Sequence, residues 1–118
     1  VLMQTGRPEE AITHFRRATE IQPGFVPARG NLGSALAMRG RLTEAEAQFR
    51  KALELDPSHA PSYFNLGLVL SERGDLEAAL RQWRKAVEIK PDYAEAQKEI
   101  ARAEAARAHR AQPPPSPR

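Results

Sequence analysis

Apolar residues recur at steps of three and four along most of the chain, which is the spacing of one face of an α-helix. The stretch 8–22 shows this clearly, because its apolar residues are Ala11, Ile12, Phe15, Ala18 and Ile21. Further stretches of this kind follow, separated by glycine or proline, which end helices or stand in their first turn. The pattern predicts an all-α protein built from short amphipathic helices.

The pattern returns every 34 residues, because matching apolar and small residues recur at equivalent positions of residues 29–57 and 63–91. The shared pairs are Leu32–Gly33 with Leu66–Gly67, Gly40 with Gly74, Ala45 with Ala79, Phe49 with Trp83, Ala52 with Ala86 and Pro57 with Pro91. One step earlier stands a partial copy with Gly6, Ala11, Phe15, Ala18 and Pro23. A fixed period of this length indicates a helical repeat array, in which each unit buries its apolar side against its neighbours.

Small residues mark the places where two antiparallel helices of one unit are expected to cross. Gly33 and Gly67 stand on the first helix of their units, and alanines stand on the second helix. Without bulky side chains there, the two helices can approach closely. Phe15, Phe49 and Trp83 are then expected to fill the space between successive units as core residues.

The last predicted helix has a polar outer face. Gln97 and Glu104 occupy the positions that Tyr63 and Leu70 hold one unit earlier, and only Ile100 keeps an apolar role. Terminal repeats need a polar face to stay soluble. Residues 94–110 are therefore interpreted as a capping helix, and the proline-rich tail 111–118 is expected to be disordered or extended.

These residues resemble the tetratricopeptide repeat, whose signature runs aromatic, leucine–glycine, alanine, aromatic, alanine and a closing proline. The third unit matches throughout, whereas the second departs at its first aromatic position, which is Arg29. The resemblance implies a right-handed α-solenoid of antiparallel helix pairs with about two and a half repeats. Its expected parts are a truncated first repeat (1–25), a second (26–59), a third (60–93), the capping helix and the tail.

The resemblance also implies a protein-protein interaction scaffold whose concave groove, lined by the first helix of each unit, binds a peptide or partner segment. Carried over by position, the groove residues are Asn31, Ser34, Met38, Phe64, Asn65, Leu68, Lys98 and Arg102. Some family members hold peptide backbones with a ladder of asparagines, and Asn31 and Asn65 resemble two rungs. The alternative is that both are solvent-facing residues of the repeat pattern.

Phe64 has two interpretations, as an anchor for a partner's apolar side chain or as packing between first helices. Another family function, the clamping of a terminal carboxylate, needs basic residues on the groove side. Gly30, Pro61 and Phe64 stand there instead, which argues against such a clamp.

The net charge of +3 comes from the C-terminal end of the chain. From Lys98 onward there are five basic and two acidic residues, a difference of +3, so residues 1–97 are neutral overall. Acids and bases alternate along the repeats, which is typical of a solvated helix surface and not of a nucleic-acid footprint. A pentatricopeptide-like RNA-binding role therefore stays a minor alternative, which a salt-sensitive gel shift would revive.

Candidate chemistry is scarce. There is no cysteine, and His14, His59 and His109 lack the spacing of a metal site, so they are expected to be solvated surface residues. No nucleophile elbow or phosphate-binding loop is present. We therefore expect no enzyme activity and no cofactor. No apolar run is long enough to span a membrane, and cytoplasmic localisation is the expectation.

The sequence begins at Val1, partway through a repeat, so we expect a segment of a longer polypeptide. This leaves a structural alternative to the binding scaffold. The segment would then be an assembly module of a larger protein, or would pair with itself as a homo-oligomer through the face that the missing first helix leaves bare.

Overall fold

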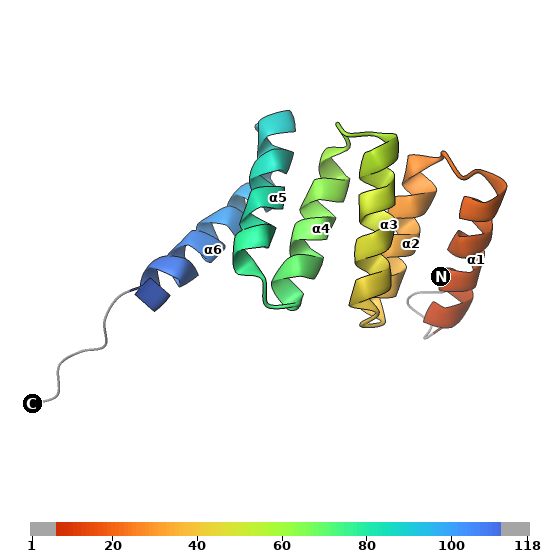
Figure 1. Cartoon of the computed structure of the whole chain (residues 1–118), viewed down its shortest axis with the longest axis horizontal. Coiled ribbons are helices and arrows are strands. Elements are labelled where there is room, and N and C mark those ends of the chain that lie inside the picture. The colour runs from red at the N-terminus through yellow and green to blue at the C-terminus, as the bar shows by residue number, and fades with distance from the viewer. Residues whose placement is uncertain (1–6, 112–118) are drawn as a thin grey trace, which may run out of the picture.

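The computed structural model describes residues 7–111, which form six α-helices and no strand (Figure 1). The helices are α1 (Pro8–Ile21), α2 (Val26–Met38), α3 (Leu42–Leu55), α4 (Ala60–Glu72), α5 (Leu76–Ile89) and α6 (Ala94–Ala111). The all-α repeat fold predicted from the sequence is confirmed. The predictions for Gly6 and for the tail from residue 112 onward lie outside the described residues.

Local signals place most helix ends. Prolines stand in the first turn of α1, α2 and α4, as predicted. Gly40 and Gly74 follow the ends of α2 and α4 with φ of 76° and 89°, a left-handed conformation that favours glycine. The carboxylate of Asp75 accepts a hydrogen bond from the backbone N–H of Ala78 at 3.1 Å and so caps α5.

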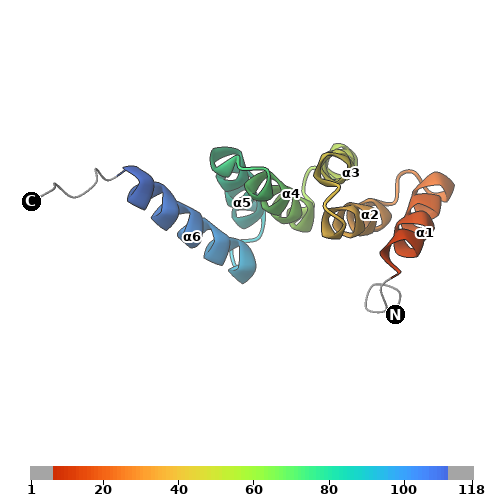
Figure 2. The ribbon, with the colours of Figure 1, turned by 90° about the horizontal axis from the view of Figure 1, so that it is seen from below.

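The helices stack into an elongated array of 63 × 32 × 22 Å. Each helix packs mainly on its neighbours in sequence, and α2 also contacts α4. Consecutive helices are antiparallel, so α2, α4 and α6 run in one direction and α1, α3 and α5 in the other (Figure 1). The same arrangement seen from below shows how the row of helices extends from α1 to α6 without closing into a bundle (Figure 2).

An aromatic ring meets a glycine within each complete helix pair. A Cβ atom placed on Gly33 would lie 2.8 Å from two ring carbons of Phe49, and one on Gly67 would lie 2.5 Å from Cδ1 of Trp83. The rings are buried, with 1% of Phe49 and 2% of Trp83 exposed. The close approach expected at these glycines is thus made by a ring of the second helix, within one unit.

The proline that follows each second helix accepts a hydrogen bond from the next unit. The donors stand 34 residues apart but differ in chemistry: Arg29 Nε to the carbonyl of Pro23 (3.3 Å), Tyr63 Oη to that of Pro57 (2.9 Å) and Gln97 Nε2 to that of Pro91 (2.5 Å). The departure from the family pattern at Arg29 therefore preserves this contact. The polar residue Gln97 preserves it as well.

A periodic set of arginine contacts also ties successive units together. Arg39 reaches Glu9 (3.0 Å), Arg73 reaches Glu46 (2.9 Å) and Arg107 reaches Glu77 (3.1 Å). Each arginine stands at or beyond the C-terminal part of a first helix and contacts the second helix of the preceding unit. Because all six side chains except that of half-buried Glu46 are exposed, each pair contributes at most about 1 kcal/mol.

Candidate functional site

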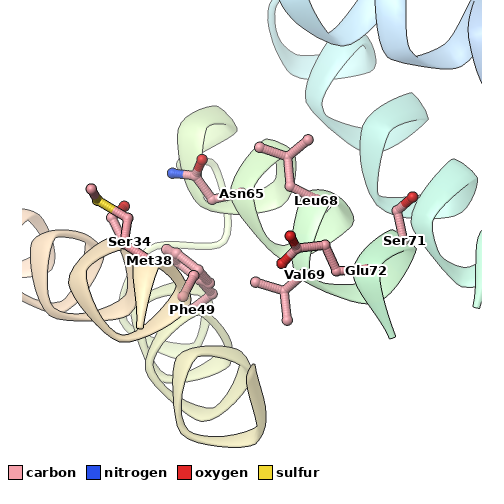
Figure 3. A pocket seen from close by; sticks show the side chains of 9 residues that line it. Ser34, Met38, Phe49, Asn65, Leu68, Val69, Ser71 and Glu72 are labelled. Carbon is pink, nitrogen blue, oxygen red and sulfur yellow. The ribbon is translucent and has the colours of Figure 1, made fainter. Parts of the chain in front are cut away.

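A cleft of about 460 Å³ lies between α2 and α4, with α3 beneath it (Figure 3). Its volume falls within the range of about 300–1,000 Å³ that is usual for ligand sites. The lining residues come from α2 (Ser34, Ala37, Met38), from α3 (Phe49) and from α4 (Asn65, Leu68, Val69, Ser71, Glu72). The cleft therefore lies between the first helices of two consecutive units.

Apolar side chains make up much of the lining. Phe49 and Val69 are buried and form the deeper wall, while Ala37 and Leu68 are half-buried. Met38 lies at the rim and is 67% exposed. Its flexible thioether suits contact with partners of varied shape. The cleft thus offers an apolar surface open to solvent.

Polar groups in the cleft offer hydrogen bonds. Asn65 is half-buried on α4, and Figure 3 shows its amide directed toward the side of the cleft where Ser34 and Met38 lie. Its carboxamide carries two donors and an acceptor, which match the N–H and C=O of a peptide backbone. Asn31 is exposed on α2 and does not line the cleft. The two expected rungs therefore have different surroundings.

Phe64 lies outside the cleft. Its ring packs on Tyr93, the residue before α6, with ring centroids 5.2 Å apart, and its carbonyl accepts a hydrogen bond from Trp83 Nε1 at 3.1 Å. Burial raises the pKa of the Tyr93 phenol, and the nearby Glu95 carboxylate raises it further. These contacts match the packing interpretation of Phe64.

Lys98 and Arg102 lie on α6 and are exposed, and neither lines the cleft. Arg102 makes a loose ion pair with Glu99, one turn earlier, at 3.7 Å. Of the eight groove residues expected from the sequence, the structure brings four to the cleft: Ser34, Met38, Asn65 and Leu68.

Five lining residues were not predicted as groove residues: Ala37, Phe49, Val69, Ser71 and Glu72. The repeat itself contained a signal for one of them, because Glu72 stands 34 residues after Met38, which was predicted as a groove residue. Phe49 was assigned to the core alone, yet its ring belongs both to the core and to the cleft. Periodicity does not reveal this second role.

The histidine expectation needs one correction. His14 and His109 are exposed, as expected, but His59 is half-buried and its Nδ1 lies 2.7 Å from Oγ of buried Ser62. The pair stands at the start of α4, where it joins the N-cap position to the first turn. Within residues 7–111 no cluster of His, Asp or Glu has the geometry of a metal site. In the same residues, no helix is both long and apolar enough to cross a bilayer.

Comparison with known proteins shows which family the chain resembles. Models of the tetratricopeptide repeat family match residues 26–92 and residues 1–25. The comparison with curated proteins gives no match.

Among solved structures, YrrB, described as a tetratricopeptide repeat protein with an unusual peptide-binding site, is 34% identical with a TM-score of 0.78. The match covers 82% of this chain and 50% of YrrB. MamA is 27% identical over 91% of this chain and 63% of its own length, with a TM-score of 0.83. The first repeat domain of RPAP3, solved with an HSP90 peptide, is 23% identical over 91% of this chain and 85% of its own, with a TM-score of 0.85, and shows the fold alone.

The chain therefore spans half of YrrB and less than two thirds of MamA. The family models cover both complete helix pairs, and the structure shows the stacked antiparallel helices that the repeat requires. The chain belongs to the tetratricopeptide repeat family.

Proposed function

We propose that this chain is a non-catalytic interaction module that binds an extended peptide, or a segment of a partner protein, in the cleft between α2 and α4. The observation that carries the proposal is the cleft itself, about 460 Å³ in volume and lined by the first helices of two units above an aromatic ring. The solved structure of YrrB, a relative with a peptide-binding site, supports it.

The lining suggests how such a segment is held. An apolar side chain of the partner would contact Leu68 and Val69 and lie over the ring of Phe49, which would remove apolar surface from water. Asn65 would pair with the partner backbone through its carboxamide. Binding of this kind depends on one anchor side chain and a few hydrogen bonds, so it tolerates variation elsewhere in the segment.

The proposal is tested with two substitutions on exposed or half-exposed helix positions. Leu68→Asn places an uncharged polar group in the cleft, and Ala47→Asn places the same group at an exposed site on α3 away from it. We expect Leu68→Asn to abolish retention of short peptides from a random library on the immobilised protein, while Ala47→Asn retains them. Equal retention by the two variants, with helical circular dichroism intact, would remove the cleft from the proposal.

Asparagine substitutions resolve the ladder hypothesis. Asn65→Ala removes a carboxamide that lines the cleft, and Asn31→Ala removes its exposed equivalent one unit earlier. If both residues are rungs, each substitution weakens a peptide selected on the native protein. If Asn65 alone holds the backbone, only Asn65→Ala does so, and the change corresponds to about 0.5–1.5 kcal/mol for one hydrogen bond.

Exposed apolar residues near α1 favour a second candidate, self-association. Ile21 is 73% exposed and Phe25 is 49% exposed at the turn between α1 and α2. Phe15 is only half-buried, unlike its equivalent Phe49. Sedimentation velocity over a range of protein concentrations tests this role. A concentration-dependent dimer that Ile21→Ser abolishes would support it, and a monomer at every concentration would contradict it.

A further inference from the structure

Glu72 is the one ionisable side chain among the residues that line the cleft. It is exposed, and among residues 7–111 it makes no ion pair within 4.0 Å. The remaining lining is apolar or uncharged, so a charged partner group that enters the cleft meets a single negative charge. An apolar surface with one such charge recognises a different class of peptide from one that is apolar throughout.

The position of Glu72 adds to this negative potential. It is the last residue of α4, where the helix macrodipole is equivalent to about half a negative charge. Met38, on the opposite wall, is the last residue of α2, and the two helices run in the same direction (Figure 1). The negative ends of both helices therefore lie at the same end of the cleft, next to the Glu72 carboxylate. A helix C-terminus prefers a positive side chain, so the negative charge of Glu72 adds to the potential there instead of neutralising it.

Arg73 follows Glu72 and Arg39 follows Met38 in the sequence, and both arginines are engaged elsewhere. Arg73 donates to Glu46 at 2.9 Å and to Thr43 at 3.2 Å, and Arg39 pairs with Glu9 at 3.0 Å. All three acceptors belong to the second helices of preceding units and do not line the cleft. Both cations thus pair with other carboxylates, and within residues 7–111 neither forms an ion pair with Glu72 within 4.0 Å.

We propose that the cleft selects a peptide segment in which a lysine or arginine stands close to an aliphatic residue. This inference rests on the proposed peptide-binding function and names its specificity. The aliphatic side chain lies over Phe49 and Val69, and the cation reaches the Glu72 carboxylate at the end of the cleft. Asn65 holds the peptide backbone without regard to sequence. The Glu72 charge determines which way along the cleft the peptide lies, because the peptide's cation has to lie at the Glu72 end.

The whole chain carries a net charge of +3, so non-specific attraction favours acidic peptides. An enrichment of basic residues among bound peptides therefore has to come from a local negative site. Glu72→Gln removes the charge and keeps the size of the side chain. Glu20→Gln is the matched control, because Glu20 is also an exposed acid in the last turn of its helix, α1, but lies outside the cleft.

The experiment passes a random short-peptide library over immobilised native protein and the two variants, and the bound fraction is sequenced. We expect lysine and arginine to be enriched near leucine, isoleucine or methionine on the native protein and on Glu20→Gln, and the enrichment to be lost on Glu72→Gln. A single synthetic peptide from the enriched set, measured by fluorescence anisotropy at low salt, is expected to bind Glu72→Gln about two- to fivefold more weakly. Its lysine-to-glutamine analogue should show no further loss on that variant.

Each other outcome overturns the inference. Peptides that are retained without a basic preference, or a preference that Glu72→Gln leaves intact, refute the specificity but leave the binding function standing, provided that Leu68→Asn abolishes retention. Retention of no peptide, or equal retention by Leu68→Asn, refutes the specificity and the binding function together. A dimer in sedimentation velocity that Leu68→Asn abolishes assigns the cleft to a second copy of this chain instead of a peptide.

Discussion

Replacing Gly67 by alanine is expected to destabilise the protein, although alanine is the better helix former. The added Cβ would lie 2.5 Å from Cδ1 of Trp83 and closer still to its Nε1. The indole is rigid, 2% exposed, and held by a 3.1 Å hydrogen bond from Nε1 to the carbonyl of Phe64. The ring therefore cannot move aside without loss of packing and of that bond.

Overpacking of a well-packed core costs about 1–3 kcal/mol, and loss of the indole hydrogen bond costs about 1 kcal/mol. The helix propensity of alanine over glycine returns about 0.8–1 kcal/mol. The expected net destabilisation by Gly67→Ala is therefore about 1–3 kcal/mol. Gly30→Ala is the control, because Gly30 also lies within a helix but has nothing within 4 Å of the added atom. It is expected to stabilise the protein by about 0.5–1 kcal/mol.

Urea unfolding followed by the fluorescence of Trp83, the single tryptophan, measures both effects. Circular dichroism provides an independent signal for global unfolding. The steric explanation also predicts that Trp83→Leu, which is destabilising by itself, makes Gly67→Ala less costly than in the native background. If Gly67→Ala proves as stable as Gly30→Ala, the close approach of the ring to α4 does not exist in solution.

Three further predictions concern contacts between helices. A hydrogen bond from Arg39 lowers the pKa of Glu9 below its ordinary value of 4.5. The stability that the ionised Glu9 contributes is therefore present above pH 4.5 and is lost as the pH falls through the lower pKa of the folded state. Unfolding free energies measured against pH should fall less on acidification for Glu9→Gln than for the native protein. Tyr63→Phe removes the hydrogen bond to the carbonyl of Pro57 and should lower the unfolding free energy by about 0.5–1.5 kcal/mol, seen as a lower urea midpoint, whereas an unchanged midpoint contradicts the contact. Arg107→Gln should cost less than about 1 kcal/mol at low salt and nothing measurable in high salt, because its ion pair is exposed; a loss that persists in high salt would contradict a screened surface contact.

The contacts of the proline carbonyls show where residue-by-residue comparison with a family pattern fails. Arg29 differs from the aromatic that the pattern favours, and Gln97 was interpreted only as part of a polar cap. Arg29 donates to the carbonyl of Pro23 and Gln97 to that of Pro91, just as Tyr63 donates to that of Pro57. Three side chains of different length and charge fit because the requirement is a hydrogen-bond donor at a given place, and not an aromatic ring.

Phe49 and Glu72 show a second limit. The ring of Phe49 was predicted as core, but the same ring also lines the cleft between α2 and α4. Glu72 is absent from the groove residues expected from the sequence. Only its position across the cleft from the end of α2 makes it the charged residue of that surface.

The sequence by itself determined the helices, their ends and their stacking, because helix periodicity, terminal proline and glycine, and the 34-residue recurrence are all local signals repeated several times. The family resemblance also placed Asn65 and Leu68 among the expected groove residues, and both line the cleft. Tertiary structure alone decided which side chains converge from α2, α3 and α4, and which arginines already have partners. Those relationships depend on how helices from separate parts of the chain cross and on the rotamers their packing permits, and no single helix carries that information.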